Sequence, residues 1–574
     1  MKLMFSDMLS QRQSPGPRVV IIGSGLGGLS AGFALRQLRF ENFTIYERAS
    51  DVGGTWRVCI TYDSHTRSFS LNVARQDNTY PGCNCDTPSH WYCHSTEPNP
   101  NWSVTHAPQP ELQTYWKHFA EKYSLYRNTI FNTNVISAAW DAAQQQYNLE
   151  VENVISGDRS WTSAEIIISA VGILMDPSFP ADINGRETFK GDLFHSARWN
   201  PSVDFQHKRV AVIGNAASAA QFIPHLVADP TVHVTNFCRT PQWFVHRDRW
   251  EWSPLHKWIF AHVPFALPLH RGWLIWTLDI LPAVKKTVFW KSSKPIEEEF
   301  TQLIRREAPG EYHNKLIPIY PASCRRAVMD SGYLSCLHLP NFNLNWDGIS
   351  EITSQGILTK TGESLPFDVV IFATGYVADR HPVTITGTQG TIQEYYTSHG
   401  GPTAYRGITI PSFPNLFLVG GPNTVTAGSE LSTAETAVNY SMKFIGPVLD
   451  GLVSSFEVKS DVTDAYNERI QKKLGNNDFV GCESWFRIGG TGKNFTLFPG
   501  SVTEYWWFLR NPIWEDYIAV GGERWERCRQ LTRIKRWART LVFALCLVWM
   551  SWSLRRGSVS QVLRWLRTRA VTSC

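Results

Sequence analysis

Two glycine-rich turns contain the residues whose types and spacing best suit chemistry. The first, Gly23-Ser24-Gly25-Leu26-Gly27-Gly28, follows a short apolar run, Arg18–Ile22. Glycines let the backbone approach a pyrophosphate closely, and the N-terminus of a following helix attracts its negative charge. A second apolar run, Phe43–Tyr46, ends at Glu47, whose carboxylate can accept hydrogen bonds from a ribose diol. The pattern predicts a strand, turn, helix and strand that bind a dinucleotide.

A similar turn, Gly214-Asn215-Ala216-Ala217-Ser218-Ala219-Ala220, follows the apolar run Arg209–Ile213. We expect a helix after it and a strand through Val232–Phe237. Here the strand is followed by Arg239 and Thr240, and a guanidinium at this position can pair with a 2′-phosphate, which favours NADPH over NADH. Ala216 replaces the usual second glycine, so its methyl group would push a pyrophosphate outward. An ordinary α/β layer without a ligand is the alternative interpretation.

Length and composition place these turns in a large globular chain. With 574 residues and about 150 residues per domain, we expect two to four domains. The content of 43% hydrophobic and 18% charged residues excludes a disordered or collagen-like protein. We predict an α/β fold with two Rossmann-like dinucleotide-binding domains, the second inserted in the first, followed by a basic amphipathic tail. The expected ranges are 17–200 and 365–520 for the first domain, 203–360 for the second and 521–574 for the tail.

The cysteines indicate the cellular compartment of the protein, and the charge distribution indicates which classes of partner to expect. The 11 cysteines are scattered, and the start of the chain lacks the apolar core of a signal peptide, so we expect reduced cysteines and a cytoplasmic protein. The formal net charge is +5 overall, but residues 521–574 alone carry +10. The remaining residues are therefore net acidic, and we expect no nucleic-acid partner.

The basic tail contains an uncharged, mostly apolar run of 15 residues between Arg539 and Arg555. A membrane span needs about 20 such residues, so a helix lying at a membrane surface through residues 531–574 is the better interpretation. A packed C-terminal helix with a solvated basic face is the alternative. A second apolar region, Trp258–Leu281, is interrupted by prolines and charges, and we expect it to be a helical excursion that lines the substrate cleft.

The segment Phe189–Asn200 carries the most specific pattern, with Phe189, Gly191, His195 and Trp199 in an F-x-G-x-x-x-H-x-x-x-W arrangement. This arrangement resembles the fingerprint of the flavin-containing monooxygenases, and especially of their Baeyer-Villiger branch. Asn200 departs from the Pro or Asp with which that branch usually ends the pattern. Within the pattern we expect His195 to link two domains rather than to transfer a proton.

The resemblance extends to two loops near the first turn. Gly53-Gly54-Thr55-Trp56 looks like the family's flavin loop, and Tyr80–Ser89 looks like the loop that carries its active-site aspartate. The resemblance implies cofactor contacts from Thr55, Trp56, Asn84, Cys85, Asp86 and Tyr92. A zinc site is the alternative for this region, but its Cys and His spacing does not support one, and we predict no metal. The residues concerned are Cys83, Cys85, His90, Cys93 and His94.

Cys324-Arg325-Arg326 resembles the segment that carries the family's catalytic arginine. Residue matching gives the catalytic role to Arg326, assisted by Asp86, and a part in holding the 2′-phosphate to Arg325. Trp485 and the pair Trp506-Trp507 are candidates for the substrate cleft, and core packing accounts for them equally well.

The family resemblance also implies the reaction. NADPH reduces FAD, O₂ adds to the reduced flavin, and the resulting C4a-peroxide attacks the carbonyl of a small organic ketone to give an ester or lactone, as in secondary metabolism. Arg326 would supply the positive charge that this anion needs, and Asp86 would orient it. Oxidation of nitrogen or sulfur, or hydroxylation, is the alternative. A second alternative is a catalytically silent flavin-binding or membrane scaffold protein.

One segment interrupts the resemblance. Residues 58–76 separate the flavin loop from the aspartate loop, which the family joins by only a few residues. Without them, the sequence reads as a continuous family-like string. We interpret the segment as a retained intron in the translated gene, with a genuine loop as the alternative.

Overall fold

The computed structural model describes residues 16–57, 78–246, 249–288, 294–475 and 477–555. The interrupting segment 58–76 therefore lies outside the described residues. Contacts divide the chain into two compact units. Unit 1 comprises the described residues up to Gly446 together with Phe456–Ile518, and unit 2 comprises Pro447–Ser455 and the described residues from Ala519 onward. Both glycine-rich turns belong to unit 1.

The first turn follows the carboxyl end of β1, the central strand of a five-stranded parallel sheet with the order β21-β7-β1-β2-β3. Strand β1 is buried along its whole length, as expected for a strand covered on both faces. The turn connects β1 to helix α1, whose glycines and alanines let it pack closely against the sheet. The elements are β1 (Val19–Ile22), α1 (Leu26–Gln37), β2 (Phe43–Tyr46), β3 (Thr129–Ile130), β7 (Ile166–Ser169) and β21 (Leu416–Leu418).

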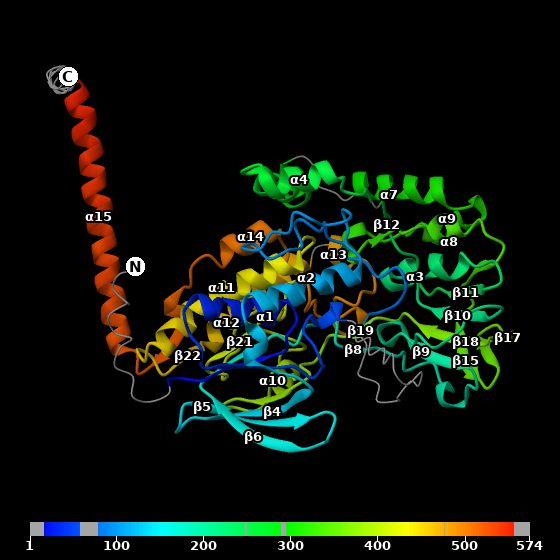
Figure 1. Ribbon diagram of the computed structural model, residues 1–574, viewed down its shortest axis with the longest axis horizontal. Coiled ribbons are helices and arrows are strands. Elements are labelled where there is room, and N and C mark those ends of the chain that lie inside the picture. The colour runs from blue at the N-terminus through cyan, green and yellow to red at the C-terminus, as the bar shows by residue number, and fades with distance from the viewer. Residues whose placement is uncertain (1–15, 58–77, 247–248, 289–293, 476, 556–574) are drawn as a thin grey trace. The chain divides into compact units, whose positions relative to one another are not determined.

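The second turn follows the carboxyl end of β10, the central strand of another five-stranded parallel sheet, with the order β14-β11-β10-β18-β9 (Figure 1). Strands β9 and β18 pair in this sheet, although they fall in the ranges that we expected to belong to the first domain. The chain thus enters the second sheet before residue 200 and leaves it after residue 365. The elements are β9 (Asp192–His195), β10 (Arg209–Ile213), α3 (Ala217–Val227), β11 (His233–Phe237), β14 (Phe342–Asn345) and β18 (Val369–Phe372).

Smaller elements surround the two parallel sheets. Strands β20, β4, β5 and β6 form a four-stranded sheet, in which β4, β5 and β6 are antiparallel neighbours. The strands of the smaller sheets are β4 (Thr133–Asp141), β5 (Gln146–Asn153), β6 (Arg159–Ala164), β8 (Asp176–Pro177), β12 (Phe244–Val245), β13 (Val328–Met329), β15 (Ile349–Thr353), β16 (Gly356–Thr359), β17 (Ser364–Pro366), β19 (Tyr376–Val377), β20 (Thr384–Thr386), β22 (Ser455–Val458) and β23 (Tyr517–Val520).

Further helices surround the sheets. The remaining helices of the central part are α2 (Gln109–Lys122), α7 (Lys294–Glu307), α8 (His313–Leu316), α9 (Tyr333–Cys336), α10 (Ile392–Ser398), α11 (Glu430–Leu449), α12 (Ser460–Leu474), α13 (Asn477–Val480) and α14 (Val502–Phe508).

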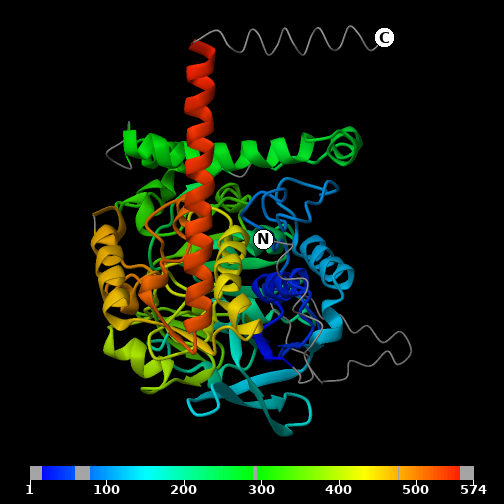
Figure 2. The ribbon, with the colours of Figure 1, turned by 90° about the vertical axis from the view of Figure 1, so that its left-hand side faces the viewer.

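The apolar region after Trp250 forms α4 (Pro254–His262), α5 (Ala266–Ile275), the π-helix η6 (Trp276–Ile280) and α6 (Leu281–Val288). These helices lie together with α7 along one side of unit 1, drawn in green in Figure 1 and Figure 2. The expected helical excursion is therefore present.

In unit 2, the tail forms the single helix α15 (Glu523–Arg555). Within the described ranges, no helix is long and apolar enough to cross a membrane.

Candidate functional site

The first turn has the close backbone contacts that only glycine allows. Gly23 has φ +98°, and a Cβ on it would lie 2.7 Å from the carbonyl oxygen of Ala170. A Cβ on Gly28 would lie 1.9 Å from the carbonyl oxygen of Gly23. The flavin-like loop reaches the same turn, because a Cβ on Gly54 would lie 2.8 Å from the Cα of Gly25. The turn and the loop thus form a cradle of bare backbone at the N-terminus of α1.

Hydrogen bonds from the first turn hold the Glu47 carboxylate in place. One carboxylate oxygen, Oε2, accepts hydrogen bonds from the backbone N–H of Ser24 at 2.7 Å and from its hydroxyl at 2.8 Å. The other oxygen, Oε1, accepts from the backbone N–H of Ala49 at 2.9 Å. The carboxylate is therefore held at the edge of the turn, where a ribose would lie in a Rossmann-like fold.

The second turn repeats the geometry with one difference. Gly214 has φ +102°, and a Cβ on it would lie 2.5 Å from the carbonyl oxygen of Ala373. Ala216 caps the N-terminus of α3 in an extended conformation and is exposed. Its methyl group therefore stands in the position where the first turn presents only the Cα of Gly25. Asn215 Nδ2 donates a hydrogen bond to the Thr240 carbonyl at 3.0 Å, which ties the turn to the strand end.

A cavity of about 1130 Å³ in unit 1 is lined by residues of both turns. This volume exceeds the 300 to 1,000 Å³ that is typical of small-molecule sites. Most of the predicted site residues line it, in agreement with a shared site: Gly23, Gly25, Glu47, Thr55, Trp56, Asn84, Cys85, Asp86, Tyr92, Gly214, Asn215, Ala216, Ala217, Ser218, Arg239, Thr240, Arg325 and Arg326.

Three predicted cofactor-binding residues do not line this cavity. Gly28 lies behind the first turn, where it permits the close approach of α1 to Gly23. Ala219 and Ala220 face the apolar core beneath the second sheet. Their role in the structure is to let helices pack, and the assignment of direct cofactor contacts to them is not supported by this geometry.

The tryptophans divide into two groups. Trp485 lines the cavity. Trp506 and Trp507 are exposed and are not among its lining residues, so neither the cleft nor the core accounts for them. The helices α4 to α6 also contribute no lining residue. Our expectation that this region lines the cleft was wrong, because its inner face packs against residues 90–94 instead.

The loop that carries Asp86 is attached to the second nucleotide turn. Gln221, on α3, accepts a hydrogen bond from the Tyr80 hydroxyl at 3.0 Å and donates one to the Asn84 carbonyl at 3.1 Å. Gly82 packs so closely on α3 that a Cβ there would lie 2.4 Å from Nε2 of His225. The helix that follows the second turn therefore positions the loop beside the first turn.

Arg326 is held between two carboxylates on the cavity wall. Its Nε and Nη2 donate to Oδ2 of Asp86 at 3.0 and 2.5 Å, and its Nη1 lies 3.9 Å from Oε1 of Glu430 at the start of α11. Asp86 raises the pKa of Arg326 above its ordinary value, so the guanidinium stays charged. Arg326 lines the cavity, and 37% of its side chain is exposed. The site thus presents a permanent positive charge to anything bound there.

Glu430 is a site residue that the sequence did not suggest. Burial raises its pKa to about 7, with opposing influences from Arg326 and Asp86. Its carboxyl therefore changes charge near neutral pH, directly beside the Asp86–Arg326 pair. No sequence motif marks it, because it lies 344 residues after Asp86 and only folding brings the two carboxylates together.

Neighbouring polar side chains are held in neutral forms. The Tyr92 hydroxyl accepts a hydrogen bond from Nε1 of Trp56 at 3.0 Å, and burial raises the pKa of Tyr92. Burial also raises the pKa of Cys85, which favours an unreactive thiol. Burial lowers the pKa of His195 to about 4. His195 ends β9, lies against Phe179 and the cavity-lining Tyr376, and does not itself line the cavity. Its expected linking role stays a prediction.

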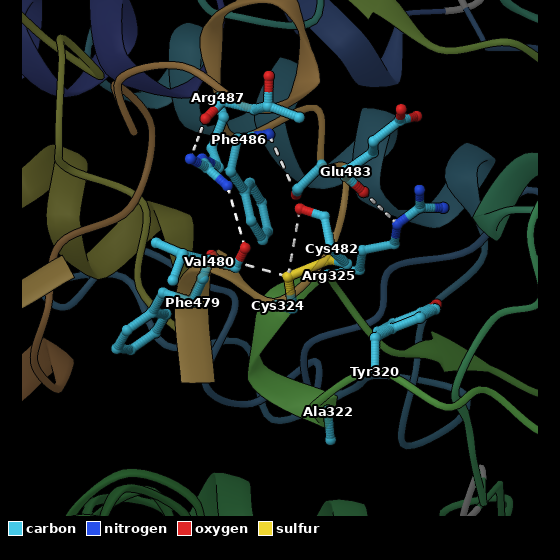
Figure 3. The surroundings of a disulfide bond; sticks show 12 residues. Tyr320, Ala322, Cys324, Arg325, Phe479, Val480, Cys482, Glu483, Phe486 and Arg487 are labelled. Atoms are coloured by element: carbon cyan, nitrogen blue, oxygen red, sulfur yellow. Dashed lines mark hydrogen bonds between the residues drawn. A yellow bond between two sulfur atoms is a disulfide. The ribbon is translucent and has the colours of Figure 1, made fainter. Parts of the chain in front are cut away.

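Arg325 points toward the segment after α13 (Figure 3). Its Nε donates to the carbonyl of Glu483 at 2.6 Å, and its guanidinium lies 5.4 Å from the ring centre of Tyr320. Burial, with Arg239 as a further influence, lowers the pKa of Arg325. The Arg239 and Arg325 side chains thus both line the cavity. Such a pair is suited to an anion such as a phosphate.

A disulfide joins the two segments that meet at Arg325. Cys324 pairs with Cys482 across 158 residues, with a Cα–Cα distance of 6.1 Å (Figure 3). This pairing differs from our expectation that the cysteines are reduced. It links the arginine-bearing segment covalently to the segment that contributes Glu483 and Trp485 to the cavity wall. Throughout the described part of the chain, no group of three or more His, Cys, Asp or Glu side chains is arranged to hold a metal ion.

Comparison with known proteins identifies the family. The sequence profile of the flavin-binding monooxygenase-like family matches residues 16–260. A protein of Streptomyces coelicolor named Baeyer-Villiger monooxygenase is 33% identical over 503 residues, which cover 85% of this chain and 90% of the relative. A Pseudomonas aeruginosa protein of the same name is 33% identical over 498 residues, which cover 84% of this chain and 88% of that protein.

A solved structure supports the same fold. The crystal structure of OTEMO in complex with FAD and NADP superimposes with a TM-score of 0.74 at 22% identity, covering 88% of this chain and 100% of the other. The family model and the two relatives show an α/β oxidoreductase of the flavoprotein monooxygenase class. The chain belongs to the flavin-binding monooxygenase-like family, in its Baeyer-Villiger branch. The resemblance inferred from the fingerprint and the two loops is confirmed.

Proposed function

We propose that this chain is an NADPH- and O₂-dependent Baeyer-Villiger monooxygenase that converts a small organic ketone to an ester or lactone with FAD as its cofactor. The observation that carries the proposal is the Asp86–Arg326 pair on the wall of a cavity lined by both glycine-rich turns. The names of the relatives and the cofactors of the solved structure support it. The first sheet, in the expected ranges 17–200 and 365–520, would serve FAD, and residues 203–360 would serve NADPH.

The first turn fits a flavin nucleotide. Its cradle consists of Gly23 and Gly25 with Gly54 against them, and a Cβ on Gly23 or Gly54 would meet neighbouring backbone at 2.7 or 2.8 Å, so a side chain there would force the cradle to shift. Glu47 would accept from the ribose hydroxyls, and Trp56 and Tyr92 would lie along the isoalloxazine end. The donor set is backbone N–H, carboxylate and aromatic, which suits the chemistry of FAD.

The second turn fits a nicotinamide nucleotide with a 2′-phosphate. Gly214 provides the close backbone approach, and Asn215, Ser218 and Thr240 line the cavity beside it. Arg239 and Arg325 would hold the phosphate, because two guanidiniums beside one cavity wall can each donate charge-assisted hydrogen bonds. The exposed methyl of Ala216 would stand against the pyrophosphate and weaken this site relative to the first.

The residues of the chain supply positioning and charge. Bound FAD, when reduced by NADPH, supplies the electrons and the oxygen activation. Arg326 would supply a permanent positive charge to the negative charge that develops on the reacting oxygen. Asp86 holds the guanidinium by its Nε and Nη2 edge. Glu430 can carry or release a proton at its carboxyl oxygen near Nη1.

One preparation of the full chain tests the proposal. We expect a yellow protein that consumes NADPH and O₂ and converts a cyclic ketone to a lactone. A thioether and an amine, assayed in parallel, separate the reaction types. Oxidation of the thioether or amine with no turnover of ketones would contradict Baeyer-Villiger chemistry. Colourless protein that neither binds FAD nor consumes NADPH would contradict the enzyme assignment and favour a silent scaffold.

The tail provides a proposed membrane contact. In α15, the run between Arg539 and Arg555 has no charged residue, and arginines stand at both ends. This composition suits a helix at the interface of an anionic membrane. Deletion of residues 531–574 should move the protein from the membrane pellet to the supernatant. Unchanged partitioning of the truncated chain would contradict the contact.

A further inference from the structure

The helices α4 and α5 of unit 1 expose large apolar side chains. Phe265, between them, is 75% exposed, and Leu269, Trp273 and Trp276 are 71%, 55% and 52% exposed. Further exposed apolar residues of the same region are Leu255, Trp258, Val263, Leu278 and Val284. Monomeric soluble proteins rarely expose a contiguous apolar patch of more than a few hundred Å² without a partner for it. We call the residues Leu255–Val284 the apolar ridge.

The ridge is apolar on both sides of α5. Leu269, Trp273 and Trp276 are spaced by four and three residues, which places them on one outward face. On the inward side, Leu267 and Leu274 are buried. A helix that is apolar all round is found inside a protein or in contact with lipid, and not on an ordinary water-exposed surface.

The inward side fixes the ridge to the body of unit 1. Arg271 donates hydrogen bonds to the carbonyls of Cys93 and His94 at 3.2 and 3.5 Å. Asp279 accepts from the backbone N–H groups of Val502 and Thr503 at 2.7 and 2.9 Å, at the start of α14. The ridge is therefore attached to the body of unit 1, next to the segment that follows Asp86.

The charges of the ridge indicate its partner. Within the ridge the sequence has Lys257 and Arg271 against one acid, Asp279, and Lys285 and Lys286 follow directly after it. Arg271 and Asp279 are used in the inward contacts, so the remaining charged residues are all lysines. Along the chain, the nearest exposed acids are Glu251 before the ridge and Glu298 after it. Each lysine near an anionic bilayer contributes about 1 kcal/mol of attraction.

We propose that the apolar ridge binds the surface of an anionic lipid membrane. Tryptophan and phenylalanine prefer the interface between lipid headgroups and acyl chains, and lysines pair with acidic headgroups. A protein partner would need acidic groups among its own apolar side chains, whereas an anionic bilayer offers both chemistries over any area. Stable attachment takes two signals, so the ridge and the proposed tail contact add to each other. The ridge proposal does not depend on the reaction that the enzyme catalyses.

Flotation with vesicles tests the ridge in the full-length flavoprotein. The probes are vesicles of phosphatidylcholine alone and of phosphatidylcholine with 30% phosphatidylserine. The ridge variant combines Phe265→Gln, Leu269→Gln and Trp273→Gln. The matched control combines Ile155→Gln and Trp161→Gln, which are 73% and 70% exposed on another part of unit 1. Flavin content and NADPH oxidation show that each variant is folded.

We expect the wild type to float with the anionic vesicles and less with the neutral ones. The ridge variant should lose at least tenfold in vesicle partitioning, and the control should match the wild type. Wild-type partitioning by the ridge variant would overturn the proposal and leave the tail as the membrane contact. So would absence of wild-type binding, or equal binding to both vesicle types. Light scattering completes the test. If the wild type is a dimer that does not bind vesicles and the ridge variant is a monomer, the partner of the ridge is a second copy of the chain.

Discussion

The two glycine-rich turns have the same backbone plan but differ in what surrounds them. In the first turn, Gly28 and Gly54 press against the turn backbone so tightly that a Cβ would clash, and the strand end carries Glu47. In the second turn, Ala219 occupies the position of Gly28, Ala216 exposes a methyl group, and Arg239 replaces the acid. The difference agrees with the proposal that the first turn binds FAD and the second binds NADPH with its 2′-phosphate.

The largest expected effect comes from the third glycine position. In Gly28→Ala the new Cβ meets the Gly23 carbonyl oxygen, and overpacking of this kind costs about 1–3 kcal/mol. Because the turn itself must shift, we expect more than tenfold weaker FAD binding and a lower Tm, measured by flavin fluorescence and calorimetry. The matched change in the second turn, Ala219→Gly, should keep FAD bound. Wild-type FAD affinity in Gly28→Ala would break the comparison.

The strand ends provide the next contrast. Arg239→Ala removes a charge-assisted contact worth about 1.5–3 kcal/mol, so KM for NADPH should rise roughly 10- to 100-fold by the corresponding tenfold per 1.4 kcal/mol. KM for NADH should hardly change, because NADH has no 2′-phosphate. Glu47→Gln serves as the comparison: it should weaken FAD and leave the NADPH preference intact. An equal rise in both KM values would show that Arg239 does not read the phosphate.

The pH dependence of ketone oxygenation tests the role of Glu430 on the flavin side of the cavity. With a pKa of about 7, Glu430 is neutral below pH 7 and becomes an anion above it. The new charge, beside Asp86 and Arg326, should lower the rate of ketone oxygenation above pH 7 by about fivefold, the equivalent of ~1 kcal/mol between charges 4 Å apart in water. Glu430→Gln should remove this inflection from the pH profile.

The pH dependence of the free energy of unfolding gives an independent check of the Glu430 pKa. The folded-state pKa is raised from 4.5 to about 7, so the folded form binds the proton more tightly in that window, and stability falls as the pH rises through it. Glu430→Gln should lack this slope. Glu435→Gln, farther along α11 and bonded to Ser95, should keep the activity inflection. Persistence of the inflection in Glu430→Gln would assign it to another group.

The smallest expected effect is a gain. Ala216→Gly removes the methyl from the N-cap of α3 and restores the usual second glycine, and glycine is also the better N-cap residue. KM for NADPH should fall about two- to fivefold, for a gain of about 0.5–1 kcal/mol. Ala217→Gly, one position inside the helix, should bring no gain. An unchanged or higher KM in Ala216→Gly would show that the methyl does not face the pyrophosphate.

Local sequence rules predicted the elements that form each turn, because strand and helix patterns and glycine geometry are properties of neighbouring residues. The strands at Phe43–Tyr46 and Arg209–Ile213 were predicted with their observed bounds. Contacts between distant segments could not be predicted. The Cys324–Cys482 disulfide spans 158 residues, and Glu430 meets Arg326 only because α11 begins beside the cavity. The outward direction of Trp273 depends equally on tertiary packing, since both faces of its helix are apolar in sequence.

The central claim is that Arg326, held by Asp86, supplies the charge that ketone oxygenation needs. The most direct measurement is the amount of ester or lactone formed per NADPH consumed by the wild type and by Arg326→Ala, each containing FAD. We predict that Arg326→Ala stays yellow and still oxidises NADPH, while product formation falls about 10²- to 10³-fold, as for loss of one preorganised charge-stabilising donor. Product formation by Arg326→Ala at the wild-type rate and yield would contradict the account.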